Sequence, residues 1–180
     1  MQTYIGPCDA VGGRTLAVFK VGTRQGDVYM SVGRTEFGNE ERAVVEVRRD
    51  ALVGLWRNEM PGSIRAPLRR STHADAMRQK LELADEGFQF GAHDPVPLVE
   101  VRCRLRPHLA PRVVNGTAAI NSTSRPYVSI VDGAARTLWL ASQGAACFPV
   151  ECSVAEAPLL ARLAGMPQSP WLRVSEMLPQ

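Results

Sequence analysis

The first third of the chain has the apolar, β-branched pattern of strands. Residues 15–21 and 28–32 are rich in valine and carry aromatic side chains, and the segment 22–27 between them has the glycines and polar residues of a turn. This pattern predicts a β-hairpin. A third short strand is expected over residues 43–47, where apolar residues again dominate.

A helical period follows the third strand. We expect this helix to begin at Asp50 as N-cap and to end at Pro61-Gly62, before a basic linker over residues 65–70. Its apolar stripe has the i, i+3, i+4 spacing and consists of Leu52, Leu55 and Trp56.

A second helix is expected after that linker. Thr72 is the predicted N-cap, Gly87 the predicted end, and residues 91–97 a loop, because Asp94-Pro95 and Val96-Pro97 both disfavour helix. One helical face collects the apolar residues Met77, Leu81, Ala84 and Phe88.

The segment 98–106 alternates between apolar and charged residues, which predicts a strand with one buried and one solvated face. Residues 107–125 are interpreted as an excursion, with a tight turn at Asn115-Gly116. The expected buried face is Val99, Val101, Cys103 and Leu105, and the solvated face is Glu100, Arg102, Arg104 and Arg106.

The last third alternates strands and helices. A strand over 127–131 leads to a helix capped by Asp132 that runs to about Gln143 and closes at Gly144, and another strand is expected over 147–152. Ser153 and Glu156 have the spacing of a capping box for a final helix. That helix should end at Gly165, and a tail rich in proline should follow.

Composition limits the classes of protein that fit. The 180 residues suit a single domain, and no apolar run is long enough for a membrane span. The N-terminus lacks the pattern of a signal peptide. The four cysteines have no metal-site spacing and are expected to be free and mostly buried, as in a reducing cytoplasm. The three histidines show no helical metal-site spacing, so we predict no metal centre.

The start of the helix after residue 131 is a candidate anion site. A helix N-terminus exposes amide N–H groups and the positive end of its dipole. Gly133 allows close approach, and the side chain of Arg136 leans back toward this end. The alternative is that Asp132 and Gly133 only end the strand and begin the helix, while Arg136 is exposed and binds no ligand.

These residues also carry a family resemblance. Residues 83–88 and 94–101 resemble the helix, glycine and proline-led strand of the ParB/sulfiredoxin superfamily. Residues 128–136, with 144–150, resemble its strand, phosphate-binding turn and helix. Within it, the chain is most similar to plasmid fertility-inhibition proteins of the Osa type, on the pieces 87–88, 95–98, 136–140 and 148–152.

The resemblance implies an α/β (α+β) fold with a ParB/sulfiredoxin-like core over residues 50–152. The expected single domain then has an N-terminal β-hairpin extension over 1–48 and a C-terminal helix and tail over 153–180. It also implies a cytoplasmic, plasmid-encoded inhibitor of conjugative DNA transfer, acting on a transfer-machinery component such as the coupling ATPase. The oligomeric state is left open.

The resemblance further implies a phosphate-binding turn at Asp132, Gly133, Ala134, Ala135 and Arg136, with ATP or another nucleotide, and Mg²⁺, as candidate ligands. The superfamily turn usually has polar residues where this chain has Ala134 and Ala135, and the sulfiredoxin cysteine is absent. An alanine cannot move a proton, so binding is favoured over catalysis. A nucleotide hydrolase or metal-dependent nuclease stays an alternative, with Asp132, Arg136 and Glu86 as candidate catalytic residues.

Charge adds a second candidate surface. The net charge is only +3, but from Glu100 to Arg136 the chain has six arginines against two acids. The face made by Arg102, Arg104 and Arg106 could bind a phosphate backbone or an acidic partner. A small DNA-binding regulator is therefore a third hypothesis, and a merely solvated strand face is its alternative.

Overall fold

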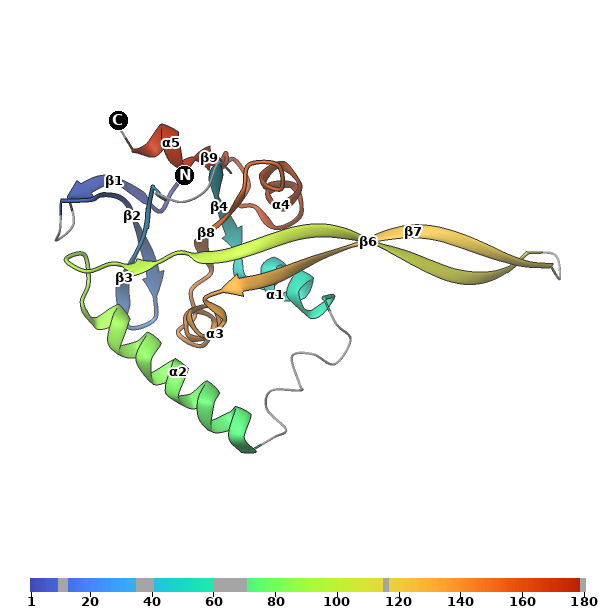
Figure 1. Cartoon of the computed structure of the whole chain (residues 1–180), viewed down its shortest axis with the longest axis horizontal. Helices are drawn as coiled ribbons and strands as arrows, with labels where there is room; N and C mark the ends of the chain where they lie inside the picture. Colours follow the sequence, from blue (N-terminus) through green and yellow to red (C-terminus); the bar gives the residue numbers. More distant parts are fainter. Residues whose placement is uncertain (10–12, 35–40, 60–70, 115–116, 179–180) are drawn as a thin grey trace.

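The protein folds into two β-sheets covered by helices, with one long hairpin leaving the domain (Figure 1). This computed structural model describes residues 1–9, 13–34, 41–59, 71–114 and 117–178, and within them the side chains of all but 71–75, 77 and 108–123. The mixed α+β class predicted from the sequence is confirmed.

The first sheet contains the predicted N-terminal hairpin. Strands β2 (Thr15–Thr23) and β3 (Gly26–Gly33) pair antiparallel, as expected. An additional strand, β1 (Tyr4–Asp9), pairs with β2, and the two-residue β5 (Val96–Pro97) lies parallel to β3. The predicted loop 91–97 therefore ends in a strand, because its proline-led residues extend along the edge of β3.

The second sheet has the strand order β7-β6-β8-β4-β9. The predicted strands over 43–47 and 147–152 are confirmed as the antiparallel neighbours β4 (Arg42–Arg48) and β8 (Cys147–Ser153). Strand β8 also pairs in parallel with the start of β6 (Val99–Val114). The segment 1–48 thus contributes to both sheets, since β4 lies inside the second one.

The excursion predicted over residues 107–125 consists mostly of the outer parts of two paired strands, which were not predicted. Strand β6 continues to Val114 and pairs with β7 (Thr117–Asp132) along its whole length, from Glu100↔Asp132 to Val114↔Thr117. Prolines at positions 107, 111 and 126 interrupt the sequence pattern typical of a strand. Proline is nevertheless tolerated in strands that have a free edge. Asn115-Gly116, the predicted turn, lies outside the described residues.

Two helices differ from their predicted ends. Helix α1 (Arg49–Arg57) has Arg48 at its N-cap position, and the carboxylate of Asp50 pairs with Arg49 at 2.8 Å instead of capping. Helix α2 (Ser71–Gln89) starts before Thr72 and continues past Gly87. Gly87 packs close to Val96, where an added Cβ would lie 3.5 Å from a side-chain methyl, so tertiary packing holds the helix through this glycine. The predicted stop at Pro61-Gly62 and the basic linker lie outside the described residues.

The C-terminal part is more ordered than predicted. Helix α4 (Ala157–Ala164) ends before Gly165 as expected, but no capping box forms, because the carboxylate of Glu156 instead accepts from the Cys103 amide. The predicted tail forms strand β9 (Leu172–Arg173) on β4 and helix α5 (Val174–Met177). Leu178 is 1% exposed, so this segment completes the core.

The core lies between the sheets and helices. Side chains from both sheets and from α1, α2 and α4 are fully or nearly fully buried, among them Phe19, Met30, Leu52, Phe148 and Leu160. Of the predicted apolar stripes, Leu52, Leu55, Ala84 and Phe88 are buried. No helix of the described residues is long and apolar enough to cross a membrane.

Candidate functional site

The turn between β7 and α3 (Ala134–Ser142) is formed as a glycine cap. Asp132 is the last residue of β7, and Gly133 is the N-cap, with φ 87° and ψ 22° in the left-handed region. The prediction that Asp132 caps the helix is therefore wrong. No side chain of the described residues caps the first turn of α3, so none of their carboxylates occupies its amide groups.

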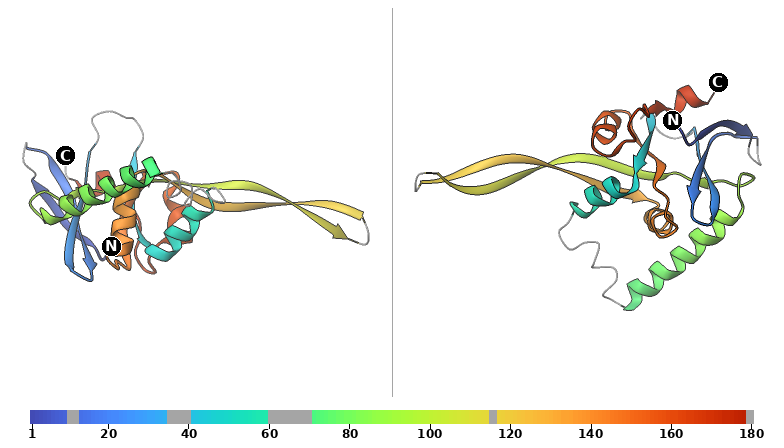
Figure 2. Two further views of the ribbon diagram at one scale, coloured as in Figure 1. Left: turned by 90° about the horizontal axis from the view of Figure 1, so that it is seen from below. Right: turned by 180° about the vertical axis from the view of Figure 1, so that it is seen from behind.

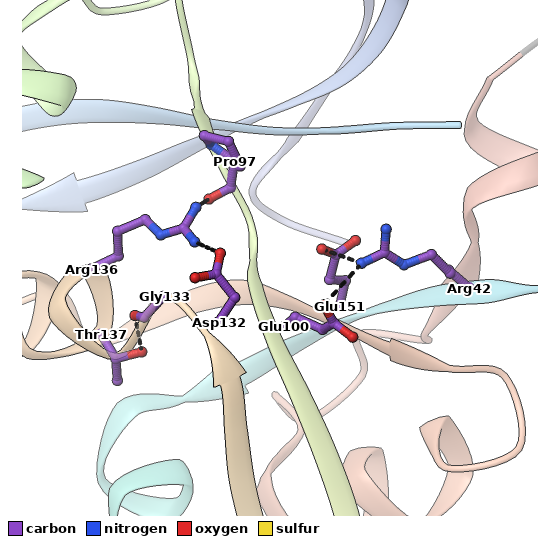
Figure 3. A network of polar contacts seen from close by, with 8 residues as sticks. All are labelled: Arg42, Pro97, Glu100, Asp132, Gly133, Arg136, Thr137 and Glu151. Atoms are coloured by element: carbon purple, nitrogen blue, oxygen red, sulfur yellow. Dashed lines mark hydrogen bonds and ion pairs between the residues drawn. The ribbon is translucent and has the colours of Figure 1, made fainter. Parts of the chain in front are cut away.

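Arg136 lies back over this glycine, as its place in the first turn predicts. Its guanidinium forms an ion pair with Asp132 and donates to the carbonyl of Pro97 at 2.6 Å (Figure 3). A Cβ at position 133 would lie 2.9 Å from Arg136 Nε. Glycine is thus required for both its backbone angle and this close approach. Arg136 is 13% exposed and ties α3 to the end of β5.

A groove of about 390 Å³ opens beside the turn, between α2, β5 and the start of α3. All five residues of the predicted phosphate turn line it, together with Lys80, Leu83 and Val131. Lys80 was not predicted as a residue of this site. The signal was available, because Lys80 lies one helical turn before the buried Ala84 and so on the same side of α2.

Glu86, the third candidate catalytic residue, is exposed on α2 and does not line this groove. The structure brings together Asp132 and Arg136, but as an ion pair with each other. A catalytic role for these residues stays a prediction.

A row of charged residues crosses the second sheet next to the turn (Figure 3). Glu100 pairs in register with Asp132 on one side and with Glu151 on the other. Arg42 reaches Glu151 at 2.5 Å and Glu100 at 3.8 Å. This row was not predicted, because Arg42 and Glu151 come from strands far apart in the chain.

Glu151 is the unusual member of the row. It is 7% exposed, and its Oε2 has no hydrogen-bond partner among the described residues. Burial raises the pKa of Glu151 to about 7, opposed by the positive charge of Arg42 and reinforced by the Glu100 carboxylate. Burial and the Glu100 carboxylate therefore favour the protonated form of Glu151.

The predicted arginine face of β6 is partly engaged. Arg104 lies 3.4 Å from the carboxylate of Glu156, and Arg106 donates to the Glu59 carbonyl at 2.7 Å while its guanidinium lies 4.6 Å from the centre of the Tyr127 ring. Arg102 is exposed and forms no ion pair or hydrogen bond with the described residues. On the opposite face Val99, Val101 and Cys103 are buried as predicted, whereas Leu105 is 51% exposed because it already lies on the projecting part of the hairpin.

The cysteines are free, as predicted. Burial raises the pKa of Cys103 to about 11 and that of Cys152 to about 12, with the nearby Glu156 carboxylate adding to both shifts. These two thiols remain protonated and unreactive at neutral pH. Within the described ranges, no cluster of three or more histidine, cysteine or acidic side chains is arranged to hold a metal ion.

Comparison with known proteins identifies the family. The family model for the plasmid fertility inhibition factor matches residues 44–165. These residues include most of β4, all of β6, β7 and β8, and both helices of the groove. The chain belongs to the plasmid fertility inhibition factor family. The resemblance to Osa-type proteins noted from the sequence is thereby confirmed.

A solved structure supports the fold of this family member. The chain is similar to the crystal structure of the Oncogenic Suppression Activity Protein, a plasmid fertility inhibition factor, in a gold(I) cyanide derivative. The TM-score is 0.60 at 20% identity, covering 96% of this chain and 81% of that chain. No curated protein matches.

Proposed function

We propose that the protein inhibits conjugative DNA transfer by binding a component of the transfer machinery, such as the coupling ATPase, from the cytoplasmic side. The family match over residues 44–165 carries this proposal. A binding role is also supported by the turn, where Ala134 and Ala135 supply no proton-transfer group and Arg136 is paired with Asp132.

The groove between α2 and α3 suits a partner segment. Leu83 is 59% exposed and Val131 48% exposed, and both line the groove beside Lys80 and the first turn of α3. Exposed apolar side chains next to a cation and free amide groups complement an apolar segment that carries a carboxylate.

A mating assay tests this proposal. The protein expressed in the donor should reduce transfer, and Leu83→Asp should restore transfer by placing a negative charge in the groove. Ile5→Asp is the matched control, since Ile5 is 54% exposed on β1, outside the groove. If donors that express the parent protein transfer several plasmid classes at an unchanged frequency, the proposal is refuted.

Nucleotide binding at the same groove is the second candidate function. The observation that favours it is the uncapped first turn of α3 beside Gly133, with Lys80 across the groove. Calorimetric titration with ATP, CTP and GTP tests binding. If the protein hydrolyses nucleotides or cleaves DNA with Mg²⁺ at this groove, Arg136→Ala should abolish the activity. Activity that survives this substitution would belong to another site.

A further inference from the structure

The β6–β7 hairpin leaves the domain as a two-stranded ribbon (Figures 1 and 2). Strand β8 pairs with β6 only at Val99 and Glu100. Beyond Leu105↔Pro126, the register continues to Val114↔Thr117 with no third strand among the described residues. At ~3.3 Å per residue, this free part extends about 30 Å. A two-stranded ribbon alone in water is only marginally stable. A partner bound along the projecting ribbon would stabilise it.

The edges of this ribbon are poorly suited to strand addition. Proline occurs at positions 107, 111 and 126, and each proline lacks the N–H that an added strand would need. Proline is one of the residues that protects exposed edges from pairing with other chains. A partner is therefore expected to contact a face of the ribbon.

The register assigns the ribbon arginines with described side chains to one face. Positions 102, 104 and 106 of β6 have the same parity, and position 125 of β7 is paired with position 106. There is no Asp or Glu from Val101 to Val131. Among the described side chains, the other face at the base of the ribbon contains apolar, proline and serine residues, so this part of the ribbon is strongly asymmetric in charge.

The charge near the base of the ribbon is mostly uncompensated. Arg102 and Arg125 are exposed and form no ion pair or hydrogen bond with the described residues. Arg106 donates to a neutral carbonyl, which leaves its charge in place. Only Arg104, among the arginines with described side chains, is paired with a carboxylate, that of Glu156.

We propose that the basic face of the β6–β7 ribbon binds the sugar–phosphate backbone of duplex DNA. A row of arginines without acids complements a polyanion, and the major groove, about 12 Å wide, admits a two-stranded ribbon. Duplex is favoured over single strands because Tyr127, the one phenylalanine, tyrosine or tryptophan from Val101 to Val131, already lies under Arg106 and is not free to stack on a base. This surface goes beyond the proposed function, since the ribbon projects away from α2 (Figure 2).

Fluorescence anisotropy with a labelled duplex of about 20 base pairs, repeated over a range of salt concentrations, tests the proposal. The variant Arg102→Gln/Arg125→Gln should lower the magnitude of the log–log salt slope by about 2 and weaken binding roughly tenfold near 0.1 M salt. The matched control, Arg78→Gln/Arg162→Gln, removes the same charge from exposed positions on α2 and α4 and should change affinity less than about twofold.

Equal weakening by both double variants would overturn the proposal, because net charge alone would then explain binding. Absence of duplex binding at about 50 mM salt, or tighter binding of the matching single strand, would also overturn it. A polyglutamate peptide that binds more tightly than the duplex would identify the face as a protein-docking surface and refute the DNA assignment. Circular dichroism of each variant checks that the fold is retained.

Discussion

The guanidinium of Arg136 is paired with the carboxylate of Asp132 at the mouth of the groove that begins at the N-terminus of α3. A negative charge therefore lies where the phosphate of a nucleotide would be bound. If nucleotide binding is retained, Asp132 opposes it.

Asp132→Asn should accordingly strengthen ATP binding. Removing one negative charge near the phosphates is worth about 1 kcal/mol, or roughly fivefold in affinity. Isothermal titration calorimetry measures the change. The control Glu82→Gln removes the same charge from an exposed position of α2 outside the groove. Weaker ATP binding by Asp132→Asn would show that the carboxylate takes part in binding.

Gly133→Ala should destabilise the protein. The backbone angle φ of 87° is unfavourable for alanine, and the new methyl group would meet the Arg136 guanidinium at about 3 Å. We expect a loss of about 1–2 kcal/mol in the free energy of unfolding, measured by urea denaturation.

Gly54→Ala is the matched control for this glycine. Gly54 lies in the interior of α1, and no atom of the described part of the chain lies within 4 Å of an added Cβ. There the substitution should stabilise by up to about 1 kcal/mol, because alanine is the better helix former. A Gly133→Ala protein as stable as its parent would contradict the strain that the structure assigns to this turn.

The raised pKa of Glu151 predicts a specific pH dependence. The folded protein binds the Glu151 proton more tightly than the unfolded chain, so the contribution of Glu151 to stability falls as pH rises from about 4.5 to about 7 and is then constant. Glu151→Gln mimics the protonated form. It should match the parent below about pH 4 and be more stable by about 3 kcal/mol at pH 8.

Chemical denaturation of both proteins across this pH range isolates the Glu151 contribution, because the other titrating groups are shared. A difference in unfolding free energy that does not vary with pH would contradict the assignment. Glu176→Gln, at an exposed position, should leave the pH profile close to that of the parent.

Ser169→Ala should loosen the C-terminal segment. The hydroxyl of Ser169 donates to the fully buried carboxylate of Glu46 at 2.7 Å, and the same carboxylate accepts from the amides of Gln2 and Thr3. Loss of a hydrogen bond to a charged group should cost about 1–2 kcal/mol.

The control for this serine is Ser175→Ala, which removes an exposed hydrogen bond to Glu41 and should change stability by less than about 0.5 kcal/mol. Hydrogen exchange of the amides in α5 and β9 provides a second measurement. Exchange unaltered by Ser169→Ala would mean that this contact does not hold the segment.

Local patterns in the sequence determined several features of this protein. The hairpin β2–β3, the alternation in the first part of β6 and the glycine turn before α3 depend on neighbouring residues, and all three were predicted. The closeness of Arg136 to that turn was also predictable, because residues one turn apart in a helix share a side.

Only the tertiary structure decided how far β6 and β7 extend, that Lys80 lies across the groove from Ala134, and that Arg42 pairs with Glu151. The tertiary structure also decided that the C-terminal segment, predicted as a tail, is folded, because Glu46 of β4 holds it through Ser169. Each depends on strand register or on packing between segments distant in the chain. Long-range pairing of this kind leaves little trace in local periodicity, because the energy that selects it comes from burial and charge pairing across the fold.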